Sequence, residues 1–121
     1  LGLGTDIVDC ARIRDAIGRS QERFEERVFT NDERAYCRRM ATPATHFAAR
    51  FAAKEATRKA MAHGPDLNWQ DVEVIRDPQG PVSIKLHGKA AQIAEDMGVK
   101  HLFLSLAHEN SMAVATVVLQ G

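Results

Sequence analysis

Several features that would assign this chain to a common protein class are scarce or missing. It has two cysteines among its 121 residues, Cys10 and Cys37, too few for a disulfide framework and without the CxxC spacing of a metal site. We interpret both as free thiols in a reducing compartment. No apolar run approaches the ~20 residues that a membrane-spanning helix needs, and no signal-peptide pattern opens the chain. We therefore expect a cytosolic protein that does not bind membranes.

An excess of charge of either sign is also missing. The 16 Lys and Arg residues balance the 16 Asp and Glu residues, which excludes a general attraction to nucleic acid. Recognition of a charged partner must therefore come from a local patch. There is no repeat or low-complexity segment, and 45% of the residues are hydrophobic. We expect one domain with a packed core over residues 1–121.

Alternating apolar residues and turn sequences predict an antiparallel sheet. The predicted strands are residues 1–8, 71–76, 82–86, 101–108 and 112–119. The segment "DPQG" (77–80) joins two of these strands as a hairpin, and "ENS" (109–111) joins two others. Because strands and helices are only partly interleaved, the predicted fold class is α+β.

Four helical regions are predicted between these strands. The first covers residues 9–27 with a break near Gly18 or Ser20, and the second begins with the capping box "TNDE" (30–33) and ends near residue 42. The third covers residues 43–62 and is stopped by "GP" at 64–65, and the fourth covers residues 88–98.

The third helix has a charge in an unexpected place. Winding "FAARFAAKEATRKA" (47–60) at 100° per residue gathers Phe47, Phe51 and several alanines into an arc of about 140°. Glu55 falls near the middle of this apolar arc. A carboxylate in such a position is costly unless it is paired or binds a metal.

Asp6 presents the same problem on the first strand, where it lies among apolar residues. Two such carboxylates on neighbouring core elements could form a site for Mg²⁺ or Mn²⁺, which prefer oxygen ligands. The alternative is that Asp6 caps the following helix and Glu55 pairs with Lys59 at i,i+4. The residues Gly2 and Gly4 would allow close backbone approach beside Asp6.

The basic residues beside Glu55 favour a phosphate-containing ligand. Arg50, Lys54 and Arg58 follow one another at intervals of four residues along one side of the arc. Beside a divalent metal, such side chains would share the negative charge of a diphosphate. The alternative is an ordinary solvated helix face. His108, at the end of a strand, is a further candidate because ligands often bind at strand ends.

These segments together resemble the holo-acyl-carrier-protein synthase family, the small trimeric group of 4′-phosphopantetheinyl transferases. The matching motifs keep the family's order over nearly the whole chain. They are "GLGTDIVDCARI" (2–13), "RFEERVFTNDE" (23–33), "RFAAKEA" (50–56), "GPVSIKLHGKA" (80–90) and "LSLAHENSMAVATVVL" (104–119). One departure is Ala107, where the family commonly has a second serine in "SLSH".

The resemblance implies a reaction and an assembly. Such enzymes transfer 4′-phosphopantetheine from coenzyme A to a serine hydroxyl of an apo acyl carrier protein, release adenosine 3′,5′-bisphosphate, and support fatty acid biosynthesis. The resemblance also implies a homotrimer with active sites at subunit interfaces. Two alternatives are a non-catalytic module that binds coenzyme A or a carrier protein, and a metal-dependent hydrolase of nucleotide diphosphates.

The resemblance further implies roles for individual residues. Asp6 and Glu55 are the expected metal ligands, and Glu55 or a water on the metal is the expected acceptor of the serine proton. The expected catalytic group is Asp6, Lys54, Glu55 and His108. The expected coenzyme A contacts are Arg50, Lys54, Lys59, Gly64 and His108.

A basic surface for the acidic carrier is expected on the first helical region. If that region were continuous, Arg12, Arg19, Arg23 and Arg27 would fall within about 80° of one another, although internal ion pairs on an evenly solvated helix would give the same pattern. By resemblance, Arg12 and Phe24 belong to the docking region. The predicted docking set is Arg12, Arg19, Arg23 and Phe24.

Overall fold

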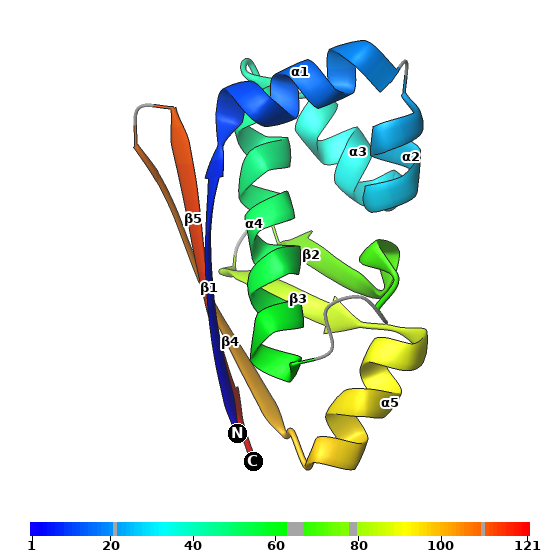
Figure 1. The fold of residues 1–121 in the computed structure, drawn as a ribbon, viewed down its shortest axis with the longest axis vertical. Coiled ribbons are helices and arrows are strands. Elements are labelled where there is room, and N and C mark those ends of the chain that lie inside the picture. The colour runs from blue at the N-terminus through cyan, green and yellow to red at the C-terminus, as the bar shows by residue number, and fades with distance from the viewer. Residues whose placement is uncertain (21, 63–66, 78–79, 110) are drawn as a thin grey trace.

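Two antiparallel sheets flank one long helix in the computed structural model, which describes residues 1–20, 22–62, 67–77, 80–109 and 111–121 (Figure 1). The first sheet has the strand order β1-β5-β4, and the second pairs β2 with β3. The strands are β1 (Gly2–Asp9), β2 (Val72–Arg76), β3 (Val82–Leu86), β4 (His101–Glu109) and β5 (Met112–Gln120). The helices are α1 (Cys10–Ser20), α2 (Arg23–Val28), α3 (Asn31–Arg38), α4 (Pro43–Met61), α5 (Gly88–Met97) and the short 3-10 helix η2 (Trp69–Asp71). This arrangement confirms the predicted α+β class and both predicted hairpin pairings.

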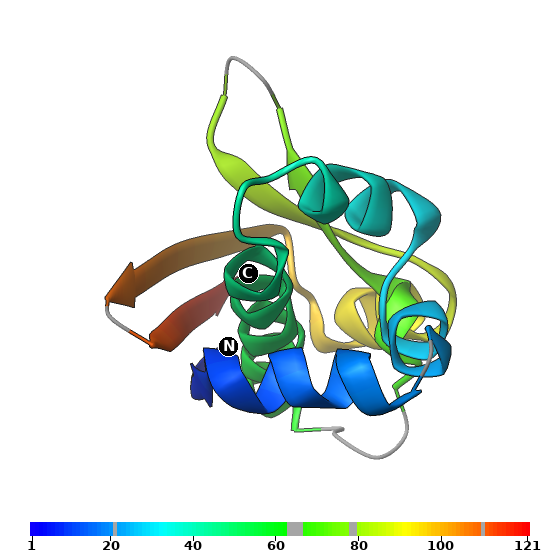
Figure 2. The same ribbon diagram turned by 90° about the horizontal axis from the view of Figure 1, so that it is seen from above.

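Helix α4 lies at the centre of the molecule. It begins with Pro43 at its first turn, where a missing N–H costs nothing, and ends at Ala62, which adopts a left-handed conformation. Figure 2 views this helix end-on, with β4 and β5 on one side and α1, α3, α5 and the second sheet around the rest. A single apolar arc was predicted, but the helix is buried on most sides because a second sheet covers it. Even Arg50 and Lys54 are buried.

Strand β1 passes unusually close to α4. A Cβ added at Gly2 would collide with the backbone oxygen of Ala60, and one added at Gly4 would collide with that of Ala56. The expected close approach at these glycines is therefore confirmed. Because β1 and α4 run in opposite directions, Asp6 lies alongside the preceding turn of α4, which contains Glu55.

The first helical region is broken where the sequence allowed a break. Helix α1 ends at Ser20, whose hydroxyl accepts a hydrogen bond from the Phe24 backbone N–H at 3.1 Å in α2. Glu22, between the two helices, has a positive φ of 79°. The capping box at Thr30 and Glu33 is confirmed, but α3 ends at Arg38 rather than near residue 42. The 3-10 helix η2 was not predicted.

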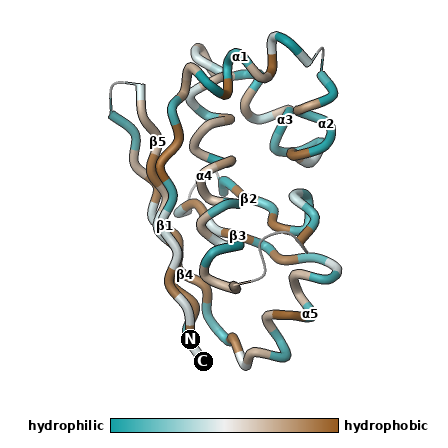
Figure 3. The backbone as a smooth tube through the Cα atoms, viewed as in Figure 1, coloured by the Kyte–Doolittle hydropathy of each residue, from teal (hydrophilic) through white to brown (hydrophobic). Residues whose placement is uncertain are grey.

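The first sheet has one buried face and one exposed apolar face. Its buried face packs on α4 through alanines and valines of β5, including Ala113, Ala115 and Val117. Hydrophobic residues nevertheless follow one another along the strands, at positions that alternate between the two faces of the sheet (Figure 3). Leu3, Ile7, Phe103 and Val118 point away from α4 and are 41–67% exposed. Among the described residues, no helix is long and apolar enough to cross a membrane.

Candidate active site

Asp6 lies on the inner face of β1, where the alternation would otherwise place a core residue. Its partner across the sheet is the fully buried Ala115. The Asp6 carboxylate accepts a hydrogen bond from Lys59 Nζ at 2.8 Å, and the same ammonium donates to the Thr5 carbonyl at 3.1 Å. Lys59 therefore bridges from α4 to β1 and neutralises Asp6.

Glu55 lies one turn before Lys59 on the same side of α4. Its carboxylate accepts a hydrogen bond from Arg58 Nη1 at 3.0 Å, and its side chain is 30% exposed. The two carboxylates singled out from the sequence thus share one end of the β1–α4 contact. Each of them has a basic neighbour from α4.

Both parts of the alternative interpretation are wrong. The helix that follows β1 is capped by Asp9, which accepts a hydrogen bond from the Ala11 N–H at 2.9 Å, and not by Asp6. Lys59 pairs with Asp6 instead of Glu55. Asp6 therefore does not cap α1.

The donor set at this position fits Mg²⁺ or Mn²⁺ only with help from a ligand. Among the described residues there is no cluster of three or more His, Cys, Asp or Glu side chains that could enclose a metal. Mg²⁺, however, is often bound by one or two carboxylates together with waters and substrate phosphates. Asp6 and Glu55 supply the hard oxygens of that kind of site, and Lys59 and Arg58 supply the positive charge that a phosphate needs.

A second group of predicted residues lines a cavity of about 450 Å³ between α4, β3 and β4. Arg50 and His108 both line it, together with His46, Arg76 and Ser105. The Arg50 guanidinium stacks on Tyr36 at 4.3 Å and donates through Nη1 to the His46 carbonyl at 3.3 Å. Its buried Nε–H has no hydrogen-bond partner among the described residues.

The electrostatics of this cavity favour an anion. Burial lowers the pKa of His46, and repulsion from Arg50, His108 and Arg76 acts in the same direction. The two arginines bring positive charge to the cavity. Two residues of this cavity, His46 and Arg76, were not singled out from the sequence. The spacing of His46 four residues before Arg50 was the available signal.

The two groups of site residues lie on opposite sides of α4. Five residues separate Arg50 from Glu55, which turns the helix by about 140° after one full circle. The Asp6–Glu55 pair therefore does not share a cavity with Arg50 and His108 in one copy of the chain. One copy therefore carries two separate groups of candidate residues. We name them the carboxylate half-site (Asp6, Glu55, Arg58 and Lys59) and the arginine half-site (His46, Arg50, Arg76 and His108).

Lys54 is not where the sequence analysis expected it. Its side chain is fully buried, and Nζ contacts Glu33 Oε1 at 2.9 Å and the carbonyls of Trp69 and Val72 at 3.1 and 2.6 Å. These three partners use all three donors of the ammonium. The predicted basic ridge is therefore wrong as a surface, and so is its alternative, a solvated face. A direct contact between Lys54 and a phosphate would require these bonds to break.

Comparison with known proteins places this arrangement in a family. The sequence profile of the 4′-phosphopantetheinyl transferase superfamily matches residues 2–117. The chain belongs to this superfamily. It is 43% identical to the holo-[acyl-carrier-protein] synthase of Syntrophotalea carbinolica over 99% of this chain and 95% of that protein.

Solved structures agree with the sequence match. The holo-[acyl-carrier-protein] synthase of Neisseria meningitidis superposes with a TM-score of 0.89 at 29% identity, over 99% of this chain and 98% of that one. The Helicobacter pylori synthase in complex with coenzyme A gives 0.84 at 29% identity, over 98% and 99%. The predicted family, fold and enzyme class are confirmed, as is the reaction, transfer of phosphopantetheine from coenzyme A to apo acyl carrier protein.

Three of the four residues predicted to dock the carrier of this transferase line one cavity despite the helix break. This cavity of about 560 Å³ lies where α1 meets α2, and it is lined by Arg19, Arg23 and Phe24, together with Arg27. Arg12 is exposed and lies seven residues before Arg19, on the same side of α1. The single stripe expected from a continuous helix is replaced by a bent basic surface.

Two further predictions for the transferase concern Gly64 and Ala107. Gly64, a predicted coenzyme A contact, lies outside the described residues. Ala107 faces the exposed outer side of the first sheet opposite Val114, whereas His108 faces the inner side. The missing hydroxyl therefore does not line the arginine half-site of its own chain.

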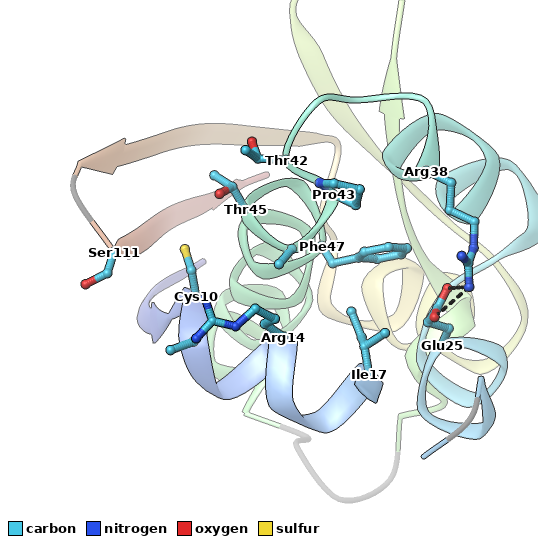
Figure 4. Close-up of a pocket in the computed structure, with 12 residues that line it drawn as sticks. Cys10, Arg14, Ile17, Glu25, Arg38, Thr42, Pro43, Thr45, Phe47 and Ser111 are labelled. Carbon is cyan, nitrogen blue, oxygen red and sulfur yellow. Dashed lines mark hydrogen bonds and ion pairs between the residues drawn. The ribbon is translucent and has the colours of Figure 1, made fainter. Parts of the chain in front are cut away.

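A further apolar cavity belongs to neither half-site. It measures about 550 Å³ and lies at the start of α4, with Cys10, Ile17 and Phe47 among its lining residues (Figure 4). At one side of it Arg38 pairs with Glu25 at 2.6 Å. None of the predicted metal, coenzyme A or docking residues lines it.

Proposed function

We propose that this transferase works with a divalent metal, Mg²⁺ or Mn²⁺, held by Asp6 and Glu55, and with coenzyme A held between two copies of the chain. The observation that carries the proposal is the division of the predicted residues into two half-sites on opposite sides of α4. A coenzyme A molecule carries a diphosphate and a 3′-phosphate. Two separated positive regions suit these two separated anionic groups.

The assignment of the half-sites follows from their chemistry. A divalent metal at Asp6 and Glu55 would neutralise the diphosphate and polarise its phosphoryl oxygens. Lys59 and Arg58 contribute further positive charge beside the same group. Arg50, with its unpartnered Nε–H, and His108 suit the phosphate on the adenosine. Phosphoryl-group transfer depends mainly on such positioning and charge stabilisation.

Assembly into a homotrimer is supported by the exposed apolar face of the first sheet. Leu3, Ile7, Phe103 and Val118 would be covered by neighbouring copies, which removes apolar surface from water. In a closed ring each copy would present one half-site to one neighbour and the other half-site to the other neighbour. The carboxylate half-site of one chain would then face the arginine half-site of the next.

Five of the predicted residues have roles outside the chemistry in this proposal. Lys54 holds α4 against β2 and η2. It thereby fixes the position of its sequence neighbour Glu55 along the helix axis. Arg12, Arg19, Arg23 and Phe24 form the docking surface for an acidic carrier protein, because positive side chains complement its charge. The site for coenzyme A and the site for the carrier thus belong to different elements.

The experiment that tests the proposal measures transfer and metal dependence together. The protein with coenzyme A, Mg²⁺ and an apo acyl carrier protein should add one phosphopantetheine mass per carrier. Glu55→Gln should lower kcat/KM by about 100-fold or more, because it removes a charged oxygen ligand and keeps the shape. Unchanged thermal stability is the control. Wild-type kcat/KM in Glu55→Gln would exclude Glu55 as a metal ligand.

The same assay separates the alternative functions. A binding module would bind coenzyme A without consuming it. A hydrolase would release 4′-phosphopantetheine from coenzyme A without any carrier present. Loss of coenzyme A only when apo carrier is added is the result expected here.

A further inference from the structure

One arginine beside the carboxylate half-site has a fixed position that its surroundings explain. Arg58 Nη1 donates to Glu55 Oε1 at 3.0 Å, and its side chain is only 14% exposed. The guanidinium carbon lies 4.0 Å from the centre of the Trp69 ring. This distance is well within the range of a favourable cation–π contact, and arginine on tryptophan is among the strongest such pairs. Arg58 is therefore bound at once to a carboxylate and to an aromatic face.

The aromatic platform under Arg58 is itself immobilised. The Trp69 ring stacks on Phe51 of α4, with centroids 5.0 Å apart and 25° between the planes. The Trp69 carbonyl accepts a hydrogen bond from buried Lys54, and Asn68 caps η2 through the Gln70 N–H at 3.1 Å. The backbone and the ring of Trp69 are thus both held by the core.

These contacts form a continuous connection from the core to Glu55. Lys54 holds the Trp69 backbone, the Trp69 ring carries Arg58, and Arg58 holds one oxygen of Glu55. We infer that Arg58, supported by Trp69, is a positioning residue that fixes the Glu55 carboxylate so that its second oxygen remains available to the metal. This inference rests on the proposed metal role of Glu55. Hydrogen bonds to ligating carboxylates typically change metal affinity by 10–100-fold when they are removed.

Charge and orientation act in opposite directions at this position. A glutamate side chain that is freed to rotate must give up this freedom again when it binds a metal, which weakens binding. The positive charge of Arg58, in contrast, repels a divalent cation. Variants that keep the charge but remove the fixed geometry separate these two effects. Arg58→Lys does this because an ammonium cannot stack as a planar guanidinium does.

The test measures Mn²⁺ binding to the free protein by the electron paramagnetic resonance signal of unbound Mn²⁺. We expect Arg58→Lys to raise the Kd for Mn²⁺ by about 10-fold, and Trp69→Leu, which leaves the arginine in place, to raise it in the same direction. In the transfer assay the Mg²⁺ concentration for half-maximal rate should rise. Arg14→Lys is the matched control, because among the described residues Arg14 forms only an exposed pair with Asp15.

The outcomes distinguish this inference from the proposed function beneath it. A Kd for Mn²⁺ that is unchanged or lower in Arg58→Lys overturns the positioning role while the metal site stands. If Mn²⁺ binding to the wild type is the same as to Glu55→Gln, the metal assignment and the positioning role both fail. Should Trp69→Leu not fold, Arg58→Lys alone decides, since Arg58 is not part of the core.

Discussion

Lys54 and Glu55 are adjacent in the sequence, but they face two regions that differ in how deeply their charged side chains are buried and how fully these are paired. On the Lys54 side, the pair of Lys54 and Glu33 is buried and satisfied: Glu33 accepts hydrogen bonds from Lys54 and from the backbone N–H groups of Thr30 and Val74. On the Glu55 side, the charges are partly exposed and each carboxylate has one basic partner. The first region has no capacity left for a ligand, whereas the second retains oxygens and donors that a ligand can use.

This difference shows how a charged motif can serve both the fold and the reaction. Burial lowers the pKa of Lys54, and the nearby Glu33 carboxylate opposes that effect. A buried pair of this kind is strongly destabilising when one partner is removed, because the other charge remains uncompensated. Exposed pairs such as Lys59 with Asp6 contribute little to stability. Stability and activity should therefore respond differently to changes on the two sides of α4.

The largest expected effect is on stability at the Lys54 side. Lys54→Met should lower the free energy of unfolding by about 3–5 kcal/mol, because it leaves Glu33 charged and buried. Lys59→Met is the matched control and should cost less than about 1 kcal/mol while it impairs transfer. Urea denaturation measures both. Equal losses of stability in the two variants would show that the two sides do not differ as described.

The next effect concerns the proposed assembly, which would bring the half-sites together. Ile7→Glu introduces a charge into the exposed apolar face of the first sheet and should convert the assembly to monomers, because burying an unpaired carboxylate is costly. The transfer rate should fall with it. Sedimentation velocity measures the assembly, and Gln92→Glu on the exposed side of α5 is the control. A fully active monomer in Ile7→Glu would place the complete site within one chain.

The smallest effect is a pH dependence from the network beside Lys54. Burial alone would raise the pKa of Glu73, but hydrogen bonds from His87 and Thr30 dominate and lower it below 4.5. Because the unfolded chain then binds more protons between pH 4.5 and the lower folded pKa, the free energy of unfolding decreases as the pH falls through this range. In Glu73→Gln this part of the decrease should vanish. Acid denaturation curves that are identical in shape for both proteins would contradict the assignment.

Much of the fold could be predicted because its signals are local. The capping box at Thr30, the proline at the start of α4 and the alternation in β4 and β5 each depend on a few neighbouring residues. The carboxylates were found because Asp6 and Glu55 interrupt apolar patterns. Glycines before Asp6 indicated the close approach of β1 to α4, which the structure confirms.

The burial of Lys54 could not be predicted because it depends on contacts with residues distant in sequence. The helical pattern placed it beside Arg50 and Arg58, but only the second sheet and η2, which follow α4, decide that this side is interior. The role of Trp69 was missed for the same reason, since η2 has no periodic pattern. The separation of Arg50 from Glu55 was missed, although the helical wheel places them about 140° apart. In the proposed assembly, a neighbouring copy of the chain would supply the missing half-site.

The most direct test of the central claim is complementation between two impaired variants. Glu55→Gln damages the carboxylate half-site, and His108→Ala damages the arginine half-site. If each site combines half-sites of two copies, randomly mixed assemblies should regain about a quarter of the wild-type transfer rate, because that share of interfaces pairs two intact halves. Mixed assemblies no more active than the separate variants would contradict a site shared between neighbouring chains.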